Sequence, residues 1–472
     1  MGRREISRRE FLRLACVASG GMALAACAPA GTPPPTAPPA AQPTEAPAAA
    51  PVETKELIVH WRTDDREMKI LQPMWRQFET EFPQYKIKEV YTSEEEHDKK
   101  TEMMVAAGTP PALWFCAGMK SQPAYAEEGQ LMVLDTFIEK DKYDTADFYE
   151  DSATIAKWQN QWIALPISVV PVVLVYNQTL FDQAGIPYPN KNWQDKNWDW
   201  DALLEQAKAL TKVEGDKTVQ FGFGGMHAQR YSPRNFGTNY WSQAGEESRY
   251  PEKFENTPEL LDAFQFMADL QNKWKVMPTP GQTEALSGGA PNPFMTGKVA
   301  MEMNGIWVLP QYAEIKDFKW DVAALPWPRF MGHDLARLDW YYLDALSAFK
   351  GVQSPDGAWE LLKFHTRPEN MIKYPLLTGF IPARRSLAKD FSGLMEQEFK
   401  IPPATSQPVI DAAAIESPNQ AAMLPHWVEV YEKGIQPSFD NLMLGQISAE
   451  QAAKEMEPIV NRILQDTKKA ES

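Results

Sequence analysis

Residue types that often catalyse reactions occur in this 472-residue chain, but they do not form a recognised catalytic pattern. The six histidines include no His-Glu-x-x-His motif and no pair at helical spacing, and the three cysteines form no Cys-x-x-Cys motif. No Gly-x-Ser-x-Gly segment is present, and no glycine-rich segment completes a nucleotide-binding fingerprint. We therefore expect no catalytic residue, no metal and no cofactor.

An acidic segment at residues 195–201 has the acid spacing of a calcium-binding loop. However, Trp200 stands where such a loop needs glycine, and Gln206 stands where it needs a bidentate glutamate. The segment is therefore interpreted as a loop that ends in a helix N-cap.

The composition excludes some classes of function. The formal charge is −16, and an acidic surface repels phosphate backbones, so we expect no nucleic-acid partner. Three cysteines are too few for a disulfide-stapled scaffold, so burial must hold the core. Aromatic residues are numerous, with 16 Trp, 15 Tyr and 22 Phe.

The N-terminus has the pattern of an export signal. The segment SRREFL at residues 7–12, with Arg8 and Arg9, resembles the twin-arginine motif, and a short uncharged run follows it. The segment LAAC that ends at Cys27 resembles a lipoprotein box. We expect residues 1–26 to be removed and Cys27 to be lipidated, which would anchor the protein outside the cytoplasm on the cell membrane. The charge would then be −19, because five Arg and two Glu are lost.

A tether is expected to follow the lipidated cysteine over residues 27–54. Nine of residues 28–54 are Pro and nine are Ala, and none is aromatic. Such a segment cannot bury a core and favours an extended backbone.

The globular part begins at residue 55 with alternating strand and helix patterns. Apolar runs at 57–61, 85–90 and 112–116 predict strands, and helical periodicity lies between them at 71–82 and 96–107. This order indicates an α/β fold with a mainly parallel sheet, whose ligands bind beyond the carboxyl ends of the strands. Later segments are more helical. Helices are expected to begin near Thr257, Ser354 and Ser448, the last with Gln451 in a capping box.

Several segments in order resemble the extracellular solute-binding proteins of ABC importers, in the sugar-binding family that includes maltose-binding protein. They are AAGTPPA at 106–112, WIALPIS at 162–168, LFDQAGI at 180–186, FMTGKVAM at 294–301, NGIW at 304–307 and GFIPAR at 379–384.

The resemblance implies a two-lobe periplasmic-binding-protein fold, type II-like, with crossing hinge strands. It assigns one lobe to residues 55–167 plus 299–336 and the other to 168–298 plus 337–472. It implies a monomer that captures a mono- or oligosaccharide by hinge closure and delivers it to the membrane subunits of an ABC permease.

Cleft residues are implied by the same resemblance. Aromatic faces cover the C–H surface of a sugar ring, and polar side chains bond its hydroxyls. Trp307 falls at an expected stacking position, and Val170 replaces an acid found in maltose binders. The full set of candidate ligand-binding residues is Trp61, Asp64, Asp65, Met119, Trp241, Trp307, Trp340, Tyr341, Phe380 and Trp427. For each aromatic residue the alternative is packing in the core.

Two alternatives in function stay open. One is an exported lipoprotein enzyme that acts on carbohydrates, since carboxylates are abundant enough to supply a catalytic pair. The other keeps the binding fold but exchanges the sugar for a peptide, a polyamine or a phosphate ester.

Overall fold

A computed structural model describes the chain at residues 54–62, 65–117, 121–225, 232–241, 251–338, 341–415 and 424–470. The predicted signal, with Arg8 and Arg9, and the predicted lipidation site Cys27 lie outside the described residues, so both stay predictions. The same holds for Asp64, Met119 and Trp340.

The first half of the sheet is built from three parallel strands. Strand β1 (Lys55–Arg62) pairs along its whole length with β2 (Tyr85–Thr92) and also with β3 (Leu113–Cys116). Helix α2 (Asp65–Glu81) connects β1 to β2, and α3 (Glu94–Ala106) connects β2 to β3. The predicted order of strands and helices is confirmed.

Periodic burial explains why α2 forms where the sequence predicts it. Leu71, Met74, Trp75 and Phe78 are buried at helical spacing. Each faces the sheet side of the helix, as expected for an amphipathic helix that covers a parallel sheet.

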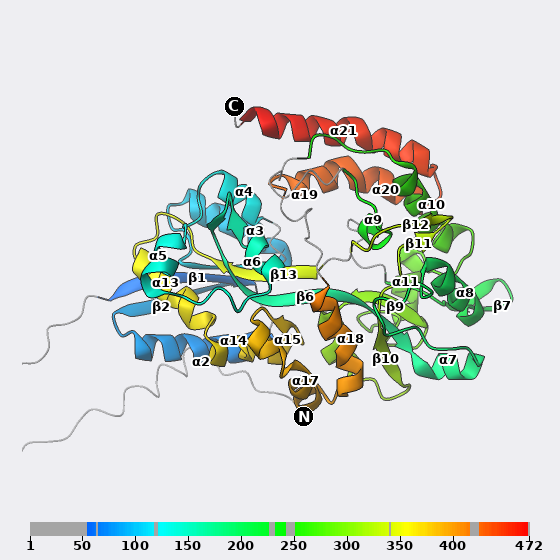
Figure 1. Cartoon of the computed structure of the whole chain (residues 1–472), viewed down its shortest axis with the longest axis horizontal. Helices are drawn as coiled ribbons and strands as arrows, with labels where there is room; N and C mark the ends of the chain where they lie inside the picture. The colour runs from blue at the N-terminus through cyan, green and yellow to red at the C-terminus, as the bar shows by residue number, and fades with distance from the viewer. Residues whose placement is uncertain are drawn as a thin grey trace, which may run out of the picture. The chain divides into compact units, whose positions relative to one another are not determined.

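Strand β6 (Leu165–Asn177) is the longest strand, and all 13 of its residues are buried. Its first part pairs with β13 (Tyr341–Ser347) and β14 (Ile381–Pro382), and its second part pairs with β9 (Met301–Gly305) and β10 (Trp320–Ala323). The main strand order is β10-β6-β13-β3-β1-β2. One strand therefore connects both halves of the molecule (Figure 1).

Two prolines lie inside β6, where a central strand normally excludes them because they cannot donate to the ladder. Pro171 is the last residue that pairs with β13, and its neighbour Val172 is the first that pairs with β9. Pro166 lies opposite Ala345, where the register of β13 shifts. Each proline thus sits where the pairing changes, and Pro171 marks the crossing between the two halves.

The remaining elements cover the two halves of the sheet (Figure 1). On the side of β1 they are α4 (Gln122–Glu127), α5 (Asp135–Asp141), α6 (Glu150–Ile155), β4 (Lys157–Trp158), β5 (Gln161–Trp162), α13 (Pro355–His365), α14 (Pro368–Met371), α15 (Lys373–Thr378) and α16 (Arg385–Ala388).

On the side of β9 they are α7 (Gln178–Ala184), α8 (Trp200–Leu210), β7 (Lys212–Glu214), β8 (Lys217–Gln220), α9 (Ser232–Asn235), α10 (Pro258–Asn272), α11 (Pro280–Ser287), η3 (Ile306–Val308), α12 (Leu309–Tyr312), β11 (Arg329–Phe330) and β12 (His333–Asp334). The C-terminal helices are α17 (Phe391–Phe399), α18 (Pro403–Ala414), α19 (Trp427–Glu429), η5 (Val430–Ile435), α20 (Gln436–Met443) and α21 (Ala449–Ala470).

The strand pairing differs from the division into lobes implied by the resemblance. Strand β13 pairs with β3, although residues 337–472 were assigned to the second lobe. Strands β9 and β10 pair with the second part of β6, although residues 299–336 were assigned to the first lobe. The reason for this pairing is that β6 changes partners between Pro171 and Val172. The lobe boundaries themselves stay a prediction.

The expected helix starts are observed, with one difference at the last helix. Asp199 accepts from the Ala202 N–H at the start of α8, so the acidic segment at 195–201 does end in an N-cap. Thr257 and Ser354 cap α10 and α13 in the same way. At α21 the Gln451 N–H donates to the Ser448 hydroxyl oxygen, while the Gln451 side-chain amide donates to Glu455.

Two of the three buried histidines, His60 and His365, have no acidic partner among the described residues. The His60 ring stacks on His97 with centroids 4.1 Å apart, and its Nδ1 lies 3.0 Å from the Thr101 hydroxyl oxygen. The His365 ring packs 4.5 Å from the Trp75 ring, centroid to centroid. Burial lowers the pKa of both His60 and His365 to about 3. Both rings are therefore neutral in the folded protein at neutral pH.

Because His60 and His365 are neutral in the folded protein, we expect the free energy of unfolding to fall in acid. Unfolded histidines take up protons near their ordinary pKa of about 6.5, while the folded rings do not until about pH 3, so stability falls as pH drops through this range. Replacing His365 by Leu should reduce the pH slope of the unfolding free energy between pH 6 and 4 by about 1.4 kcal/mol per pH unit.

Urea denaturation at several pH values measures this slope. An unchanged slope in His365→Leu would show that His365 accepts a proton in the folded state.

Candidate ligand-binding site

The carboxyl ends of β1 and β3 border a cavity of about 210 Å³. Its lining combines one guanidinium, two carboxylates and several uncharged side chains: Arg62, Glu95, His97, Asp98, Trp114, Cys116, Ala117 and Ser121. This is the edge where a parallel sheet is expected to bind ligands. Arg62 and Ala117, which follow directly after the predicted strands at 57–61 and 112–116, are among its lining residues.

Hydrogen bonds fix the floor of this cavity. His97 Nε2 lies 2.8 Å from the Phe115 carbonyl oxygen and 3.0 Å from Trp114 Nε1, and Thr92 Oγ1 lies 3.1 Å from His97 Nδ1. The Arg62 guanidinium lies over the Phe115 ring, 5.2 Å from its centroid. The imidazole therefore ties the ends of the three strands together beneath the cavity.

Cys116 lines the cavity but is a poor nucleophile. Its side chain is buried, and this burial raises the pKa of the Cys116 thiol far above its ordinary value. The reactive form of cysteine is the thiolate, so the thiol stays inert at neutral pH. Among the described residues Cys116 is a free cysteine, as expected.

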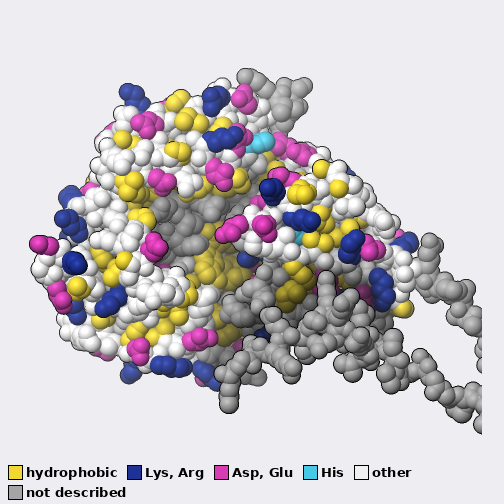
Figure 2. Space-filling view, turned by 180° about the vertical axis from the view of Figure 1, so that it is seen from behind, with side chains coloured by type: hydrophobic (Ala, Val, Ile, Leu, Met, Phe, Trp, Pro, Cys, Tyr) yellow, Lys and Arg dark blue, Asp and Glu magenta, His cyan; other side chains and the backbone are white. Residues whose placement is uncertain are grey.

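A larger groove of about 690 Å³ continues from this cavity, because Asp98 and Ser121 line both. Helices α3 and α4 form one wall, and residues 425–433 of α19 and η5 form the other. The side chains of Glu127 and His426 approach to 3.7 Å across it. The face of the molecule in Figure 2 is likewise hollowed, with hydrophobic and acidic side chains around the hollow.

An aromatic pair lies beside the crossing strand. The rings of Trp307 and Tyr342 have centroids 5.6 Å apart, and both side chains are partly exposed. Trp307 follows β9 on the turn η3, and Tyr342 on β13 pairs with Val170 of β6. Because Val170 is apolar, so is the base of this surface. It offers two ring faces next to the point where β6 changes partners.

Gly305 sets the position of the Trp307 ring. A Cβ atom at Gly305 would come within 1.9 Å of that ring. Any side chain at this position would therefore displace the indole.

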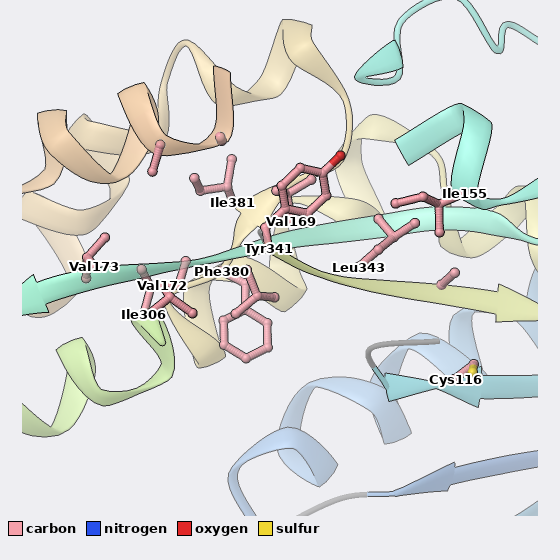
Figure 3. Packing of buried hydrophobic residues seen from close by; sticks show 14 of the residues in the cluster. Cys116, Ile155, Val169, Val172, Val173, Ile306, Tyr341, Leu343, Phe380 and Ile381 are labelled. Atoms are coloured by element: carbon pink, nitrogen blue, oxygen red, sulfur yellow. The ribbon is translucent and has the colours of Figure 1, made fainter. Parts of the chain in front are cut away.

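The other predicted aromatic residues within the described ranges are buried. Trp61 has no exposed surface and stacks on Phe115 at 4.5 Å, so its ring faces are covered in this structure. Trp241 and Trp427 lie together, with ring centroids 5.8 Å apart and little exposure. Tyr341 and Phe380 lie beside β6 in the apolar cluster of Figure 3.

The structure thus brings the predicted residues into separate groups. Trp241 and Trp427 share one cluster, Tyr341 and Phe380 flank β6, and Trp61 belongs to the core under β1. Asp65 begins α2, and its side chain is not described. The roles of all these residues in binding stay predictions.

Sequence reasoning missed several residues that line the site, among them Tyr342, Arg62 and Asp98. Tyr342 is the neighbour of the predicted Tyr341, and alternate residues of a strand face opposite sides. From strand alternation alone, one could have predicted that only one of the two tyrosines faces the site, but not which one. Only the register against β6 shows that Tyr342 faces Trp307.

Comparison with known proteins identifies the family. Residues 74–403 match the model of the bacterial extracellular solute-binding protein family. The chain belongs to this family, whose members bind solutes for transport and are not enzymes, and which implies an extracytoplasmic location.

Curated relatives include binding proteins of Brucella abortus (strain 2308) and Brucella suis biovar 1 (strain 1330). Each is 26% identical over 231 residues, which is 48% of this chain and 51% of the relative. The chain spans about half the length of these curated relatives.

Solved structures confirm the two-lobe fold. An ABC substrate-binding protein from Listeria monocytogenes in complex with cycloalternan is similar, with a TM-score of 0.64, 20% identity and coverage of 87% of this chain and 99% of that chain. A solute-binding protein from Thermotoga lettingae bound to α-D-tagatose has a TM-score of 0.66, 20% identity and coverage of 87% and 100%. The maltose/maltodextrin-binding domain of Bdellovibrio bacteriovorus bound to maltotriose has a TM-score of 0.66, 18% identity and the same coverage.

Two searches of the described residues gave negative results. Within the described ranges, no group of three or more His, Cys, Asp or Glu is arranged to hold a metal ion. The helices of the same ranges include none that is long and apolar enough to cross a membrane.

The glycine beneath Trp307 generates a prediction. In Gly305→Ala the new methyl group must push the indole away from Tyr342, so the pair should lose its present geometry. We expect the Trp307 contribution to the fluorescence spectrum to shift, and binding of any ligand that contacts the pair to weaken by about tenfold. Gly281→Ala is the matched control, because no atom lies within 4 Å of a Cβ there. Wild-type spectra and binding in Gly305→Ala would contradict the assignment.

A buried carboxyl group, that of Glu302, lies on β9, the strand that leads to Trp307. Glu302 of β9 accepts from Asn304 at 3.0 Å and from the Tyr312 hydroxyl, and a Cβ at Gly225 would come within 2.3 Å of its side chain. Burial raises the pKa of Glu302 to about 7. The carboxyl group therefore links the 224–225 segment to the strand that leads to Trp307.

The raised pKa of Glu302 predicts that stability falls as the pH rises, which is opposite in sign to the effect of the histidines. The folded protein binds a proton at Glu302 between about pH 4.5 and 7, so this stabilisation is lost as the pH rises through that range. Glu302→Gln should gain stability relative to wild type by roughly 2–3 kcal/mol between pH 4.5 and 8. Urea denaturation of both proteins measures the difference, and a pH-independent difference would contradict the prediction.

Proposed function

We propose that this protein is the extracytoplasmic receptor of an ABC importer and that its ligand is a carbohydrate. The observation that carries the proposal is the partly exposed Trp307–Tyr342 pair beside the crossing strand β6, within a two-lobe solute-binding fold. The similar proteins from Listeria, Thermotoga and Bdellovibrio are described with bound saccharides.

The chemistry of the site fits a sugar ring. The apolar C–H faces of a pyranose stack on aromatic rings, and Trp307 and Tyr342 offer two such rings. The neighbouring cavity supplies Arg62, Glu95 and Asp98, whose guanidinium and carboxylates can bond hydroxyl groups. The aromatic pair would thus cover the apolar surface of the sugar, while the charged side chains of the cavity bond its hydroxyl groups.

The mechanism follows from the crossing strand. A ligand that contacts both halves of the sheet binds their closed arrangement more tightly than their open one. Binding therefore shifts the protein toward the closed arrangement. The closed protein would then present the sugar to the permease. The predicted lipid anchor at Cys27 and the tether over 27–54 would keep the receptor at the membrane surface.

A thermal-shift screen of mono- and oligosaccharides tests the function. A sugar at 100 times its Kd contributes about 2.7 kcal/mol to the free energy of unfolding, which should raise Tm measurably. Trp307→Ala and Tyr342→Ala should each weaken binding of the best sugar by about tenfold or more. The half-buried Trp274, beyond α10, provides the control Trp274→Ala, which should bind as wild type does.

Two outcomes would contradict the proposal. Cleavage of labelled oligosaccharides would indicate an enzyme, which neither the family nor the cavity predicts. A rise in Tm with peptides, polyamines or phosphate esters, but with no sugar, would assign a different solute to the same fold.

A further inference from the structure

A small internal cavity lies between strand β1 and the helices that cover it. Its volume is about 10 Å³, and its walls come from β1, α2, β6 and the helices α13, α14 and α15. Leu71, Met74 and Ile167 make part of the wall apolar, while Trp61 and His365 contribute ring nitrogens. None of its lining residues also lines the cavity at the strand ends or the larger groove, so it is separate from the candidate ligand-binding site.

Two polar atoms at this cavity have no hydrogen-bond partner among the described residues. They are Nε1 of Trp61 and Nε2 of His365. The two residues have 0% and 5% of their surface exposed, so bulk solvent does not reach these atoms. The two rings lie close together, with centroids 5.3 Å apart and planes inclined by 30°. Both unpaired nitrogens therefore belong to one small region of the core.

Folded proteins bond nearly all of their buried polar groups, and ordered water often supplies the partner. A neighbouring indole follows this rule. The ring of Trp75 packs against the same imidazole, and its N–H donates to the Tyr91 hydroxyl at 3.0 Å. For Trp61 and His365 no described side chain fills this role, so a molecule enclosed in the cavity is the remaining partner.

The chemistry of the two atoms selects the kind of molecule. An indole N–H only donates, so the partner must accept a hydrogen bond from Trp61. The His365 ring is neutral, because burial lowers its pKa to about 3, and its Nε2 accepts or donates according to the tautomer. Water both donates and accepts, so it satisfies the two nitrogens with either tautomer. The described residues that line the cavity include no carboxylate, so nothing there attracts a cation.

The size of the cavity limits the number of molecules. A buried water needs a cavity of roughly 10 Å³ or more by this measure. The cavity offers about 10 Å³. One water fits, whereas two waters or an organic molecule do not.

We propose that one water molecule occupies this cavity and bridges Trp61 Nε1 to His365 Nε2. The bridge joins the end of β1 to the end of α13 and holds the Trp61 indole against Phe115, on which it stacks at 4.5 Å. The Arg62 guanidinium lies 5.2 Å from the centroid of the same Phe115 ring, so the bridge also supports a side chain of the candidate site. This water site goes beyond the proposed function, because it does not depend on which solute the protein binds.

A high-resolution crystal structure of the full chain tests the proposal without any substitution. We expect a single density peak at a hydrogen-bond distance of about 2.8–3.2 Å from both nitrogens. In solution, the Trp61 indole N–H should show a nuclear Overhauser effect to water in a deuterated sample with ¹⁵N-labelled tryptophan. Trp61→Phe identifies this signal by removing it.

Two further substitutions test the bridge itself. His365→Leu removes one partner of the water, so the Trp61 signal to water should be lost. Trp75→Phe is the matched control, because the Trp75 indole packs against the same imidazole but already donates to Tyr91. This variant should keep both the density peak and the signal.

Several outcomes would overturn the inference. One is a cavity without density together with no water signal from Trp61, and another is a side chain of the protein bonded to either nitrogen in place of the water. Retention of the signal in His365→Leu would overturn the bridge, and an equal loss in Trp75→Phe would overturn its assignment to this pair. If His365→Leu fails to fold, the crystal structure and the wild-type signal decide. None of these results bears on sugar binding, so the proposed function stands or falls separately.

Discussion

All 13 residues of strand β6 are buried, so neighbouring strands must satisfy its backbone polar groups. It meets this requirement with different partners at its two ends, β13 and β14 on one side of Pro171 and β9 and β10 on the other. The two halves of the sheet are therefore joined by main-chain hydrogen bonds to one strand. Proline at the change of partner leaves no N–H group unbonded there.

The candidate site follows from this arrangement. Trp307 lies on η3 directly after β9, and Tyr342 lies on β13, and these strands pair with β6 on opposite sides of Pro171, so a ligand that contacts both rings would touch both halves. The polar cavity lies at the carboxyl ends of β1 and β3, where His97 ties the strand ends together. The larger groove continues from it to α19. The cavity and this groove adjoin each other, because Asp98 and Ser121 line both.

Local patterns predicted much of the fold. The strands at 55–62 and 85–92, helix α2 and the N-caps at Asp199, Thr257 and Ser354 depend on neighbouring residues, which the sequence displays directly. The site depends on contacts between distant segments. Trp61 lies at a strand end, but His365 and Tyr374, some 300 residues later, enclose it. Whether Tyr341 or Tyr342 faces Trp307 depends on the register of β13 against β6, and no local signal sets that register.

The central claim is that a sugar closes the two halves of the molecule about β6. Spin labels at position 139 on α5 and position 212 on β7, both exposed, would report the distance between the halves by double electron–electron resonance. Cys16 and Cys27 are first replaced by Ser so that the labels attach only at the two chosen positions. With a saturating sugar that raises Tm, the distance distribution should shift to shorter values and become narrower. A distribution that stays the same with that sugar bound would contradict closure about the crossing strand.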